Sequence, residues 1–125
     1  MKTNDNKFSS NINLWLDIKA DIELKIIAGD YEVGEKLTIS NISEVYSIGK
    51  TTAQKVLEAL CTENIIINRK GIGYFVKPFV KEILSTAHLV ELKARINNIV
   101  KYGLRIGMDK STLIDILSNA YDNLN

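Results

Sequence analysis

Apolar residues recur every three or four positions through most of this chain, which is the spacing of α-helices that bury one face. Residues 13–28 give the clearest example, and Gly29 directly after them is suited to end a helix in a left-handed conformation. Residues 30–36 are charged and contain Gly34, so we expect a loop there. The apolar positions of the predicted helix are Leu14, Trp15, Ile18, Ile22, Ile26 and Ile27.

A short helix, a tight turn and a longer helix are predicted over residues 40–61. Ser40 is suited to cap the short helix, and Gly49 removes a side chain where the two helices bend close together. The longer helix has an apolar face and a polar face. The apolar positions are Ala53, Val56, Leu57, Leu60 and Cys61, and the polar positions are Lys50, Thr51, Gln54, Lys55 and Glu58. Such a helix suits a DNA groove, because a core holds one face while lysine, threonine and glutamine reach outward.

A two-stranded β-hairpin is predicted next, with strands at residues 65–67 and 74–76. Its tip, Arg69-Lys70-Gly71-Ile72-Gly73, is basic and rich in glycine. A Gly-x-Gly pair in a hairpin usually only permits positive φ. At this spacing after the polar helix we favour contact with DNA, because glycines let a backbone approach a narrow groove. A nucleotide-phosphate loop is disfavoured, since that motif leads from a strand into a helix.

Several short motifs follow one another in a fixed order through this region. They are Gly29, Gly34-Glu35-Lys36-Leu37, Ile48-Gly49-Lys50-Thr51-Thr52-Ala53, Leu60 and Arg69-Lys70-Gly71-Ile72-Gly73-Tyr74-Phe75-Val76. In this order they resemble the winged helix-turn-helix of the GntR family of bacterial transcription regulators, over residues 12–77. The remaining residues, 78–125, resemble the small YtrA-like branch, which has two helices where other branches carry a large ligand-binding domain.

The resemblance implies that the protein binds double-stranded DNA through the longer helix and the hairpin. Gln54 is the best candidate for reading a base, because its amide can pair with adenine bidentately. The family often has arginine there, so we expect a changed base preference. The family's Pro-Ser followed by Glu and Arg is missing at Thr38-Ile39, and Ser40 and Asn41 stand nearest to the absent arginine. The predicted DNA-binding residues are Ser40, Lys50, Thr51, Thr52, Gln54, Lys55, Arg69, Lys70, Gly71 and Gly73.

The C-terminal part has a long helical pattern over residues 79–106, then Gly107, then Asp109 as the N-cap of a last helix. Apolar residues on the long helix alternate three and four apart, which forms a heptad-like seam where Gly103 would allow close approach. Two helices of this size cannot form a large core alone, so we expect them to pack on the same hairpin of a second subunit. The predicted dimer-interface residues are Leu89, Leu92, Ile96, Ile99, Gly103, Ile106, Leu113 and Leu117.

The net charge of +1 says nothing about nucleic acid, but the distribution of charge does. Residues 50–77 contain five basic and two acidic residues, whereas residues 12–49 contain three basic and seven acidic residues. A local basic surface on a nearly neutral protein is able to bind phosphate.

No metal, cofactor or catalytic site is predicted. Cys61 is the only cysteine and fits the apolar pattern, and His88 has neither metal-ligand partners at a suitable spacing nor a nucleophile to activate. No apolar run approaches the length of a membrane span. The polar residues 1–11, which we expect to be flexible, lack the apolar region of a secretory signal. We therefore expect a cytoplasmic protein.

These patterns predict a mainly α fold with a small β-hairpin. Residues 1–11 form a flexible N-terminus, residues 12–77 the winged helix-turn-helix, and residues 78–125 a helical dimerisation or effector region. The expected function is sequence-specific binding of a homodimer to an inverted-repeat operator, as a transcription repressor. The alternative is a protein-interaction module that uses the winged helix as a scaffold, which the lysines on the polar face disfavour. A small-molecule effector is possible, but no residue pattern identifies one.

Overall fold

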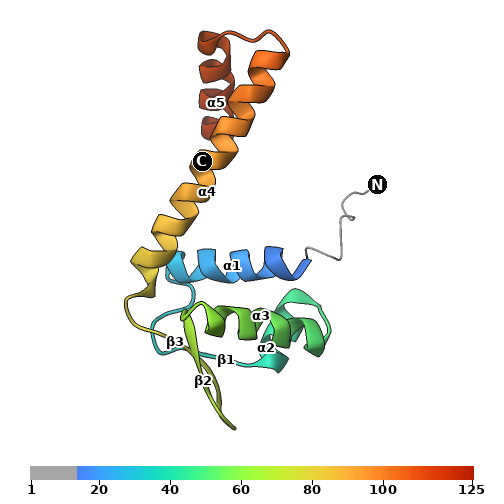
Figure 1. Ribbon diagram of the computed structural model, residues 1–125, viewed down its shortest axis with the longest axis vertical. Coiled ribbons are helices and arrows are strands. Elements are labelled where there is room, and N and C mark those ends of the chain that lie inside the picture. The colour runs from blue at the N-terminus through green and yellow to red at the C-terminus, as the bar shows by residue number, and fades with distance from the viewer. Residues whose placement is uncertain (1–13) are drawn as a thin grey trace. The chain divides into compact units, whose positions relative to one another are not determined.

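The computed structural model describes residues 14–125, so the predicted flexible segment 1–11 and the first residues of the predicted domain, 12 and 13, lie outside the described part. The described chain contains five helices and a small antiparallel sheet, which confirms the predicted fold class (Figure 1). The elements are α1 (Leu14–Ala28), β1 (Lys36–Leu37), α2 (Ile39–Tyr46), α3 (Lys50–Thr62), β2 (Ile66–Arg69), β3 (Gly73–Val76), α4 (Val80–Arg105) and α5 (Lys110–Leu124).

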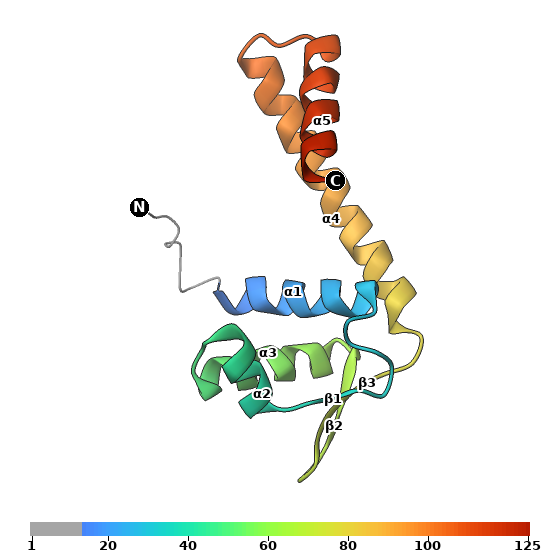
Figure 2. The same ribbon diagram turned by 180° about the vertical axis from the view of Figure 1, so that it is seen from behind.

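The chain divides into two compact units, one ending at Ser85 and one over Thr86–Asn125. In the first unit α1 lies alongside α3, while β2 and β3 extend together away from the helices (Figures 1 and 2). This unit runs past residue 77, because Val80 and Leu84 at the start of α4 are buried in its core.

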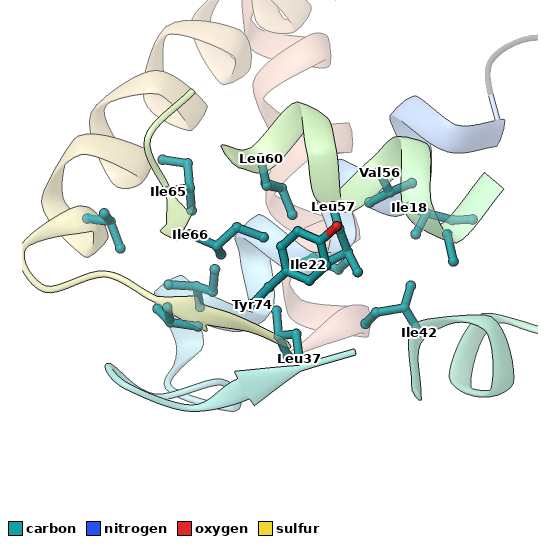
Figure 3. Close-up of a cluster of buried hydrophobic side chains, with 14 of the residues drawn as sticks. Ile18, Ile22, Leu37, Ile42, Val56, Leu57, Leu60, Ile65, Ile66 and Tyr74 are labelled. Carbon is teal, nitrogen blue, oxygen red and sulfur yellow. The ribbon is translucent and has the colours of Figure 1, made fainter. Parts of the chain in front are cut away.

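The core of the first unit forms between the helices and the inner face of the sheet. Figure 3 shows side chains from α1, α2, α3 and the strands converging on Leu57 and Tyr74. Ile22, Ile42 and Leu57 have no exposed surface at all. The labelled core residues are Ile18, Ile22, Leu37, Ile42, Val56, Leu57, Leu60, Ile65, Ile66 and Tyr74. Close packing of this cluster fixes α3 along one face and leaves its other face to solvent.

The sheet has three strands in the order β1-β3-β2. The predicted hairpin is present as β2 and β3, and β1 adds a third strand where only a loop was predicted. Lys36 lies opposite Phe75 and Leu37 lies opposite Tyr74. The Gly34 amide donates to the Val76 carbonyl at 2.8 Å, and the Val76 amide donates to the Glu35 carbonyl at 3.1 Å. The strand escaped prediction because two residues are too few to show an alternating pattern.

Helix ends follow the expected chemistry at most positions. Gly29 has φ +89°, as expected for a residue that ends α1. The N-cap of α2 is Thr38 and not Ser40, since the Thr38 Oγ1 accepts from the Asn41 amide at 3.0 Å. Both residues have a suitable hydroxyl, and the chain starts the helix two positions earlier than predicted.

A polar cluster joins α1 to α2. The Tyr46 hydroxyl donates to the Asp21 carboxylate at 2.6 Å, and the Lys25 ammonium lies 3.3 Å from the same carboxylate and 4.8 Å from the centre of the Tyr46 ring. The hydrogen bond from Tyr46, with help from Lys25, holds the pKa of Asp21 below its usual value. Burial and the nearby carboxylate raise the pKa of Tyr46 to about 12.

Lys19 joins α1 to the end of α3. Its ammonium lies 2.9 Å from the Glu23 carboxylate on its own helix and 2.9 Å from the Glu63 carboxylate at the C-cap of α3. Burial alone would lower the pKa of Lys19, but the hydrogen bonds and charges of the two carboxylates outweigh it, so the pKa is raised.

The second unit is a helical hairpin made by α5 and the part of α4 beyond Ser85. Gly107 has φ +79° between the helices, and the Asp109 carboxylate caps α5 by accepting from the Thr112 amide at 2.9 Å, both as predicted. Gly103 is buried, and a Cβ built on it would lie 3.4 Å from a methyl of Leu113. No residue of α5 is buried. Among the described residues, no helix combines the length and hydropathy needed to cross a bilayer.

Candidate nucleic-acid interface

Helix α3 presents one fully polar face. Its inner positions, Ala53, Val56, Leu57 and Leu60, have no exposed surface. Lys50, Thr51, Gln54, Lys55 and Glu58 are exposed, and Thr52 is half-buried. The core therefore fixes the axial rotation of α3, and that rotation determines which side chains reach a ligand.

The turn before α3 differs from the prediction in one respect. Ser47 adopts the left-handed conformation with φ 53° and caps the C-terminus of α2, whereas Gly49 is extended and forms the N-cap of α3. A Cβ on Gly49 would meet nothing within 4 Å, so the idea that Gly49 removes a side chain where the helices crowd together was wrong. The Ser43 hydroxyl, which donates to the Ile48 carbonyl, closes the turn instead.

Gln54 is held by a neighbour on the same face. Its side-chain nitrogen donates to the Glu58 carboxylate at 2.9 Å, one helical turn further along. An amide nitrogen carries two hydrogens, so one remains for a base while the carboxylate restrains the rotation of the group. Glu58 was placed on this face by the sequence, but its role as the partner of Gln54 was missed.

The start of α2 and the start of α3 share a shallow polar hollow of about 480 Å³. It brings together two predicted DNA-binding residues, Ser40 and Lys50. Its lining residues are Thr38, Ser40, Asn41, Ser43, Glu44 and Lys50. Hydroxyl and amide groups beside a lysine are the groups that bind phosphate oxygens in protein–DNA complexes.

The hairpin β2–β3 places the basic tip beyond the core. Gly71 has φ +82° at the turn, and the Ile72 amide donates to the Arg69 carbonyl at 2.9 Å. Lys70 and Ile72 are exposed. The Arg69 guanidinium lies 5.6 Å from the centre of the Phe75 ring, so the ring positions this cation along the hairpin.

Lys55 lies apart from the other predicted residues. Its ammonium is 4.6 Å from the centre of the Trp15 ring on α1. Trp15 itself is half-buried against the core, as expected for a structural tryptophan. The structure thus places Lys55 at the border with α1, while Lys50, Thr51 and Gln54 occupy the first turns of α3.

Among the described residues of the first unit, Lys19 and Lys25 on α1 form ion pairs, one of which reaches Glu63 at the end of α3. Lys19 and Lys25 have acidic partners, but Lys36, Lys50 and Lys70 make no ion pair with any described residue. Cations that are exposed and unpaired are free to neutralise phosphates. No group of three or more histidine, cysteine, aspartate or glutamate side chains in the described residues is arranged to hold a metal ion.

The predicted dimer-interface residues lie in the helical hairpin. Leu89, Leu92, Ile96, Ile99, Ile106 and Leu117 are all exposed in the single chain. Leu113 lies within the chain where a side chain at position 103 would be, so Gly103 lets α5 approach α4. An apolar groove of about 400 Å³ runs along the hairpin, lined by Val100, Leu104, Met108, Asp109, Lys110, Leu113, Ile114 and Leu117.

Comparison with known proteins extends these observations. The profile of the family described as "Bacterial regulatory proteins, gntR family" matches residues 14–76, slightly more than half of the 125 residues. Among curated proteins, none matches the chain significantly.

Solved structures share the arrangement of elements. A GntR family transcriptional regulator from Listeria monocytogenes is 23% identical, with a TM-score of 0.72 over 90% of this chain and 96% of that chain. A transcriptional regulator from Oenococcus oeni is 13% identical, with a TM-score of 0.71 over 91% of this chain and 95% of that chain. BusR from S. agalactiae, in complex with its busAB-promotor DNA, is 25% identical, with a TM-score of 0.53 over 88% of this chain and 54% of that chain.

Proposed function

Because the chain belongs to the gntR family of bacterial regulatory proteins, we propose that it binds a specific operator as a homodimer and represses transcription there. It is a DNA-binding transcription regulator, and the operator, the dimer and the sign of regulation are the parts we propose. A bacterial operator lies in the cytoplasm, where we place the protein. The two-helix C-terminal region supports assignment to the small YtrA-like branch.

The observation that carries the proposal is the exposed polar face of α3, fixed by a fully buried opposite face. The first turns of such a helix are the part that contacts base edges in the major groove. Gln54 would read adenine, with Glu58 restraining its amide. Thr51 and Thr52 would contact phosphates or thymine methyls, and Lys50 would neutralise a phosphate beside Ser40.

The wing would contact DNA next to the recognition helix. Lys70 is exposed at the tip, and Gly71 adopts a positive φ that only glycine adopts readily. Absence of a side chain at Gly71 leaves room for the sugar–phosphate backbone, since nothing of the protein lies within 4 Å of a Cβ built there. BusR, which has a similar fold, is in complex with promotor DNA in its solved structure, and this supports DNA binding by the fold.

Exposed apolar residues of the hairpin support the homodimer. Most leucines and isoleucines beyond Ser85 are exposed in the single chain, and exposed apolar patches mark protein interfaces. The apolar groove between Leu104 and Leu117 would receive side chains of the second subunit. A two-fold axis through paired hairpins presents two recognition helices to one duplex, which requires an inverted-repeat operator.

Salt dependence of DNA binding tests this proposal. We expect a dimer that contacts roughly six to ten phosphates to show a slope of log K against log salt of about −5 to −9. The measurement is fluorescence anisotropy of a labelled duplex from the upstream region of the protein's own gene, with a shuffled duplex as control. Failure to bind either duplex at low salt would support the alternative of a protein-interaction module.

A further inference from the structure

Strand β1 brings a lysine to the wing that the sequence pattern assigned to a loop. Side chains of paired antiparallel residues point to the same side of a sheet. Leu37, Tyr74 and Val76 are buried, so they define the inner face. Lys36 pairs with Phe75 and therefore lies on the outer face.

Gly73 belongs to the same outer face, because it lies two residues before Phe75 on β3. A Cβ built on Gly73 would lie 3.2 Å from Cγ and 3.4 Å from Cδ of Lys36. The aliphatic part of Lys36 therefore occupies the space that a side chain at position 73 would fill. Gly73 also has φ +151°, so this position favours glycine for two separate reasons.

Arg69 lies on the same outer face, on strand β2, which borders β3 on the side opposite to β1. It pairs with Gly73 in the β2–β3 register, and its guanidinium lies over the Phe75 ring. Two cations from the outer strands thus flank a central glycine that has no side chain. Lys36 makes no ion pair with a described residue, so its ammonium is available.

We infer that Lys36, whose aliphatic part occupies the space left by Gly73, is a phosphate-contacting residue of the wing, and that Lys36 and Arg69 together bind the sugar–phosphate backbone of one DNA strand. The inference rests on the proposed binding of operator DNA. It assigns a contact to a residue outside the helix-turn-helix and outside the hairpin tip. A lysine in this position adds affinity on any sequence, because phosphates carry no base information.

The test compares Lys36→Met with the wild type in anisotropy titrations, using a fluorescein-labelled duplex recovered by selection from random DNA. Methionine keeps the aliphatic part of the side chain and removes the charge. We expect affinity to fall about 10- to 60-fold at about 0.1 M salt, because each subunit loses about one released counterion. The salt slope of the dimer should become shallower by about 2.

Matched variants make the result specific. Lys36→Arg keeps the charge and should retain both the affinity and the slope. Lys81→Met removes an exposed lysine at the start of α4 and should change neither. The Lys36 inference is overturned if Lys36→Met keeps the wild-type slope while Lys50→Met makes it shallower, and that result leaves operator binding intact. A wild-type protein that binds no duplex at all would overturn the inference and the proposed function together.

Discussion

At the scale of single residues, the cluster of Tyr46, Asp21 and Lys25 shows how one hydrogen bond ties α1 to α2. Helix α2 is only eight residues long and contributes a single fully buried side chain, Ile42. A short helix with so little buried surface depends on specific contacts for its position. The hydroxyl of Tyr46 supplies one such contact, because it joins the end of α2 to Asp21 on α1.

Tyr46→Phe should therefore lower the free energy of unfolding by about 1 kcal/mol at neutral pH, the usual value of one hydrogen bond in a half-buried site. Tyr31→Phe is the matched control, because the Tyr31 ring lies near Lys25 but its hydroxyl makes no hydrogen bond with a described residue. Urea denaturation of the three proteins at equal concentration measures the difference.

The pH dependence of the same pair follows from the pKa of Asp21. That pKa is lowered in the folded protein from 3.8, chiefly by the hydrogen bond from Tyr46. The stabilisation is fully present above the unfolded value and is lost as pH falls through the folded value. The difference between the wild type and Tyr46→Phe should accordingly shrink below about pH 4. A difference that stays constant down to pH 2 or so would mean that the carboxylate is not the partner.

Some of the site residues could be predicted from the sequence pattern, and others could not. The polar face with Lys50, Thr51 and Gln54 was predictable, because helical periodicity alone fixes which positions share a face. The Gln54–Glu58 bond was within reach, since residues four apart on a helix are neighbours. The position of Lys36 on the wing could not be predicted, because it depends on pairing with a strand almost forty residues away in the chain.

At the scale of elements, the turn between α2 and α3 has a serine where the backbone favours glycine and a glycine where a helix N-cap favours serine. Ser47 has φ 53°, a conformation that costs an ordinary residue energy and glycine almost none. Gly49 is the N-cap of α3 with extended backbone and no side-chain cap, in a position where serine would supply a hydrogen bond. Each residue would serve better in the place of the other.

The exchange Ser47→Gly with Gly49→Ser should stabilise the protein. Relief of the left-handed conformation, reduced by the greater entropy of glycine in the unfolded chain, contributes about 0.5–1 kcal/mol. The new cap adds a few tenths, roughly 0.3 kcal/mol. Open space around Gly49 leaves room for the serine. The denaturation midpoints of both single variants and the double variant give the check, and a fall in stability for Ser47→Gly would contradict the turn described here.

Element prediction succeeded where the pattern was long and failed where it was short. The bounds of α4, Val80–Arg105, lie within one residue of the predicted helix, because many turns share one period. The strand Lys36–Leu37 has only two residues and is defined by its partners. The local pattern could not decide between Thr38 and Ser40 as the N-cap of α2 either, since both residue types cap helices well.

At the scale of the whole molecule, the helical hairpin is the part whose apolar side chains are not buried within a single chain. The buried hydrophobic residues of the described chain end at Leu84, and the hairpin beyond it exposes most of its leucines and isoleucines. The sequence predicted an interface because two helices of this size cannot form a large core alone, but it could not separate contacts between subunits from contacts within the chain. Gly103 and Leu113 show the difficulty, because they meet inside the hairpin.

Ile99→Glu tests the dimer. Ile99 is 47% exposed in the single chain, so a monomer tolerates glutamate there. In a symmetric dimer the substitution would place two charges in an apolar seam, and we expect the dissociation constant to rise about 100-fold or more. Asn98→Glu introduces the same charge at the next position, rotated away on the helix, and should leave dimerisation unchanged. Sedimentation velocity over a concentration series measures both, and equal dissociation constants for the two variants would place the interface elsewhere.

We propose that the dimer presents the polar face of α3 twice to one duplex. Selection of bound sequences from random DNA, followed by sequencing of the winners, tests it most directly. We expect an inverted repeat whose half-site centres lie about one helical turn apart or a multiple of it. Gln54→Ala should weaken binding by about 1–3 kcal/mol and relax one position in each half-site. Selected sequences without a shared motif, or a motif that Gln54→Ala leaves equally strict at every position, would contradict sequence recognition by the polar face of α3.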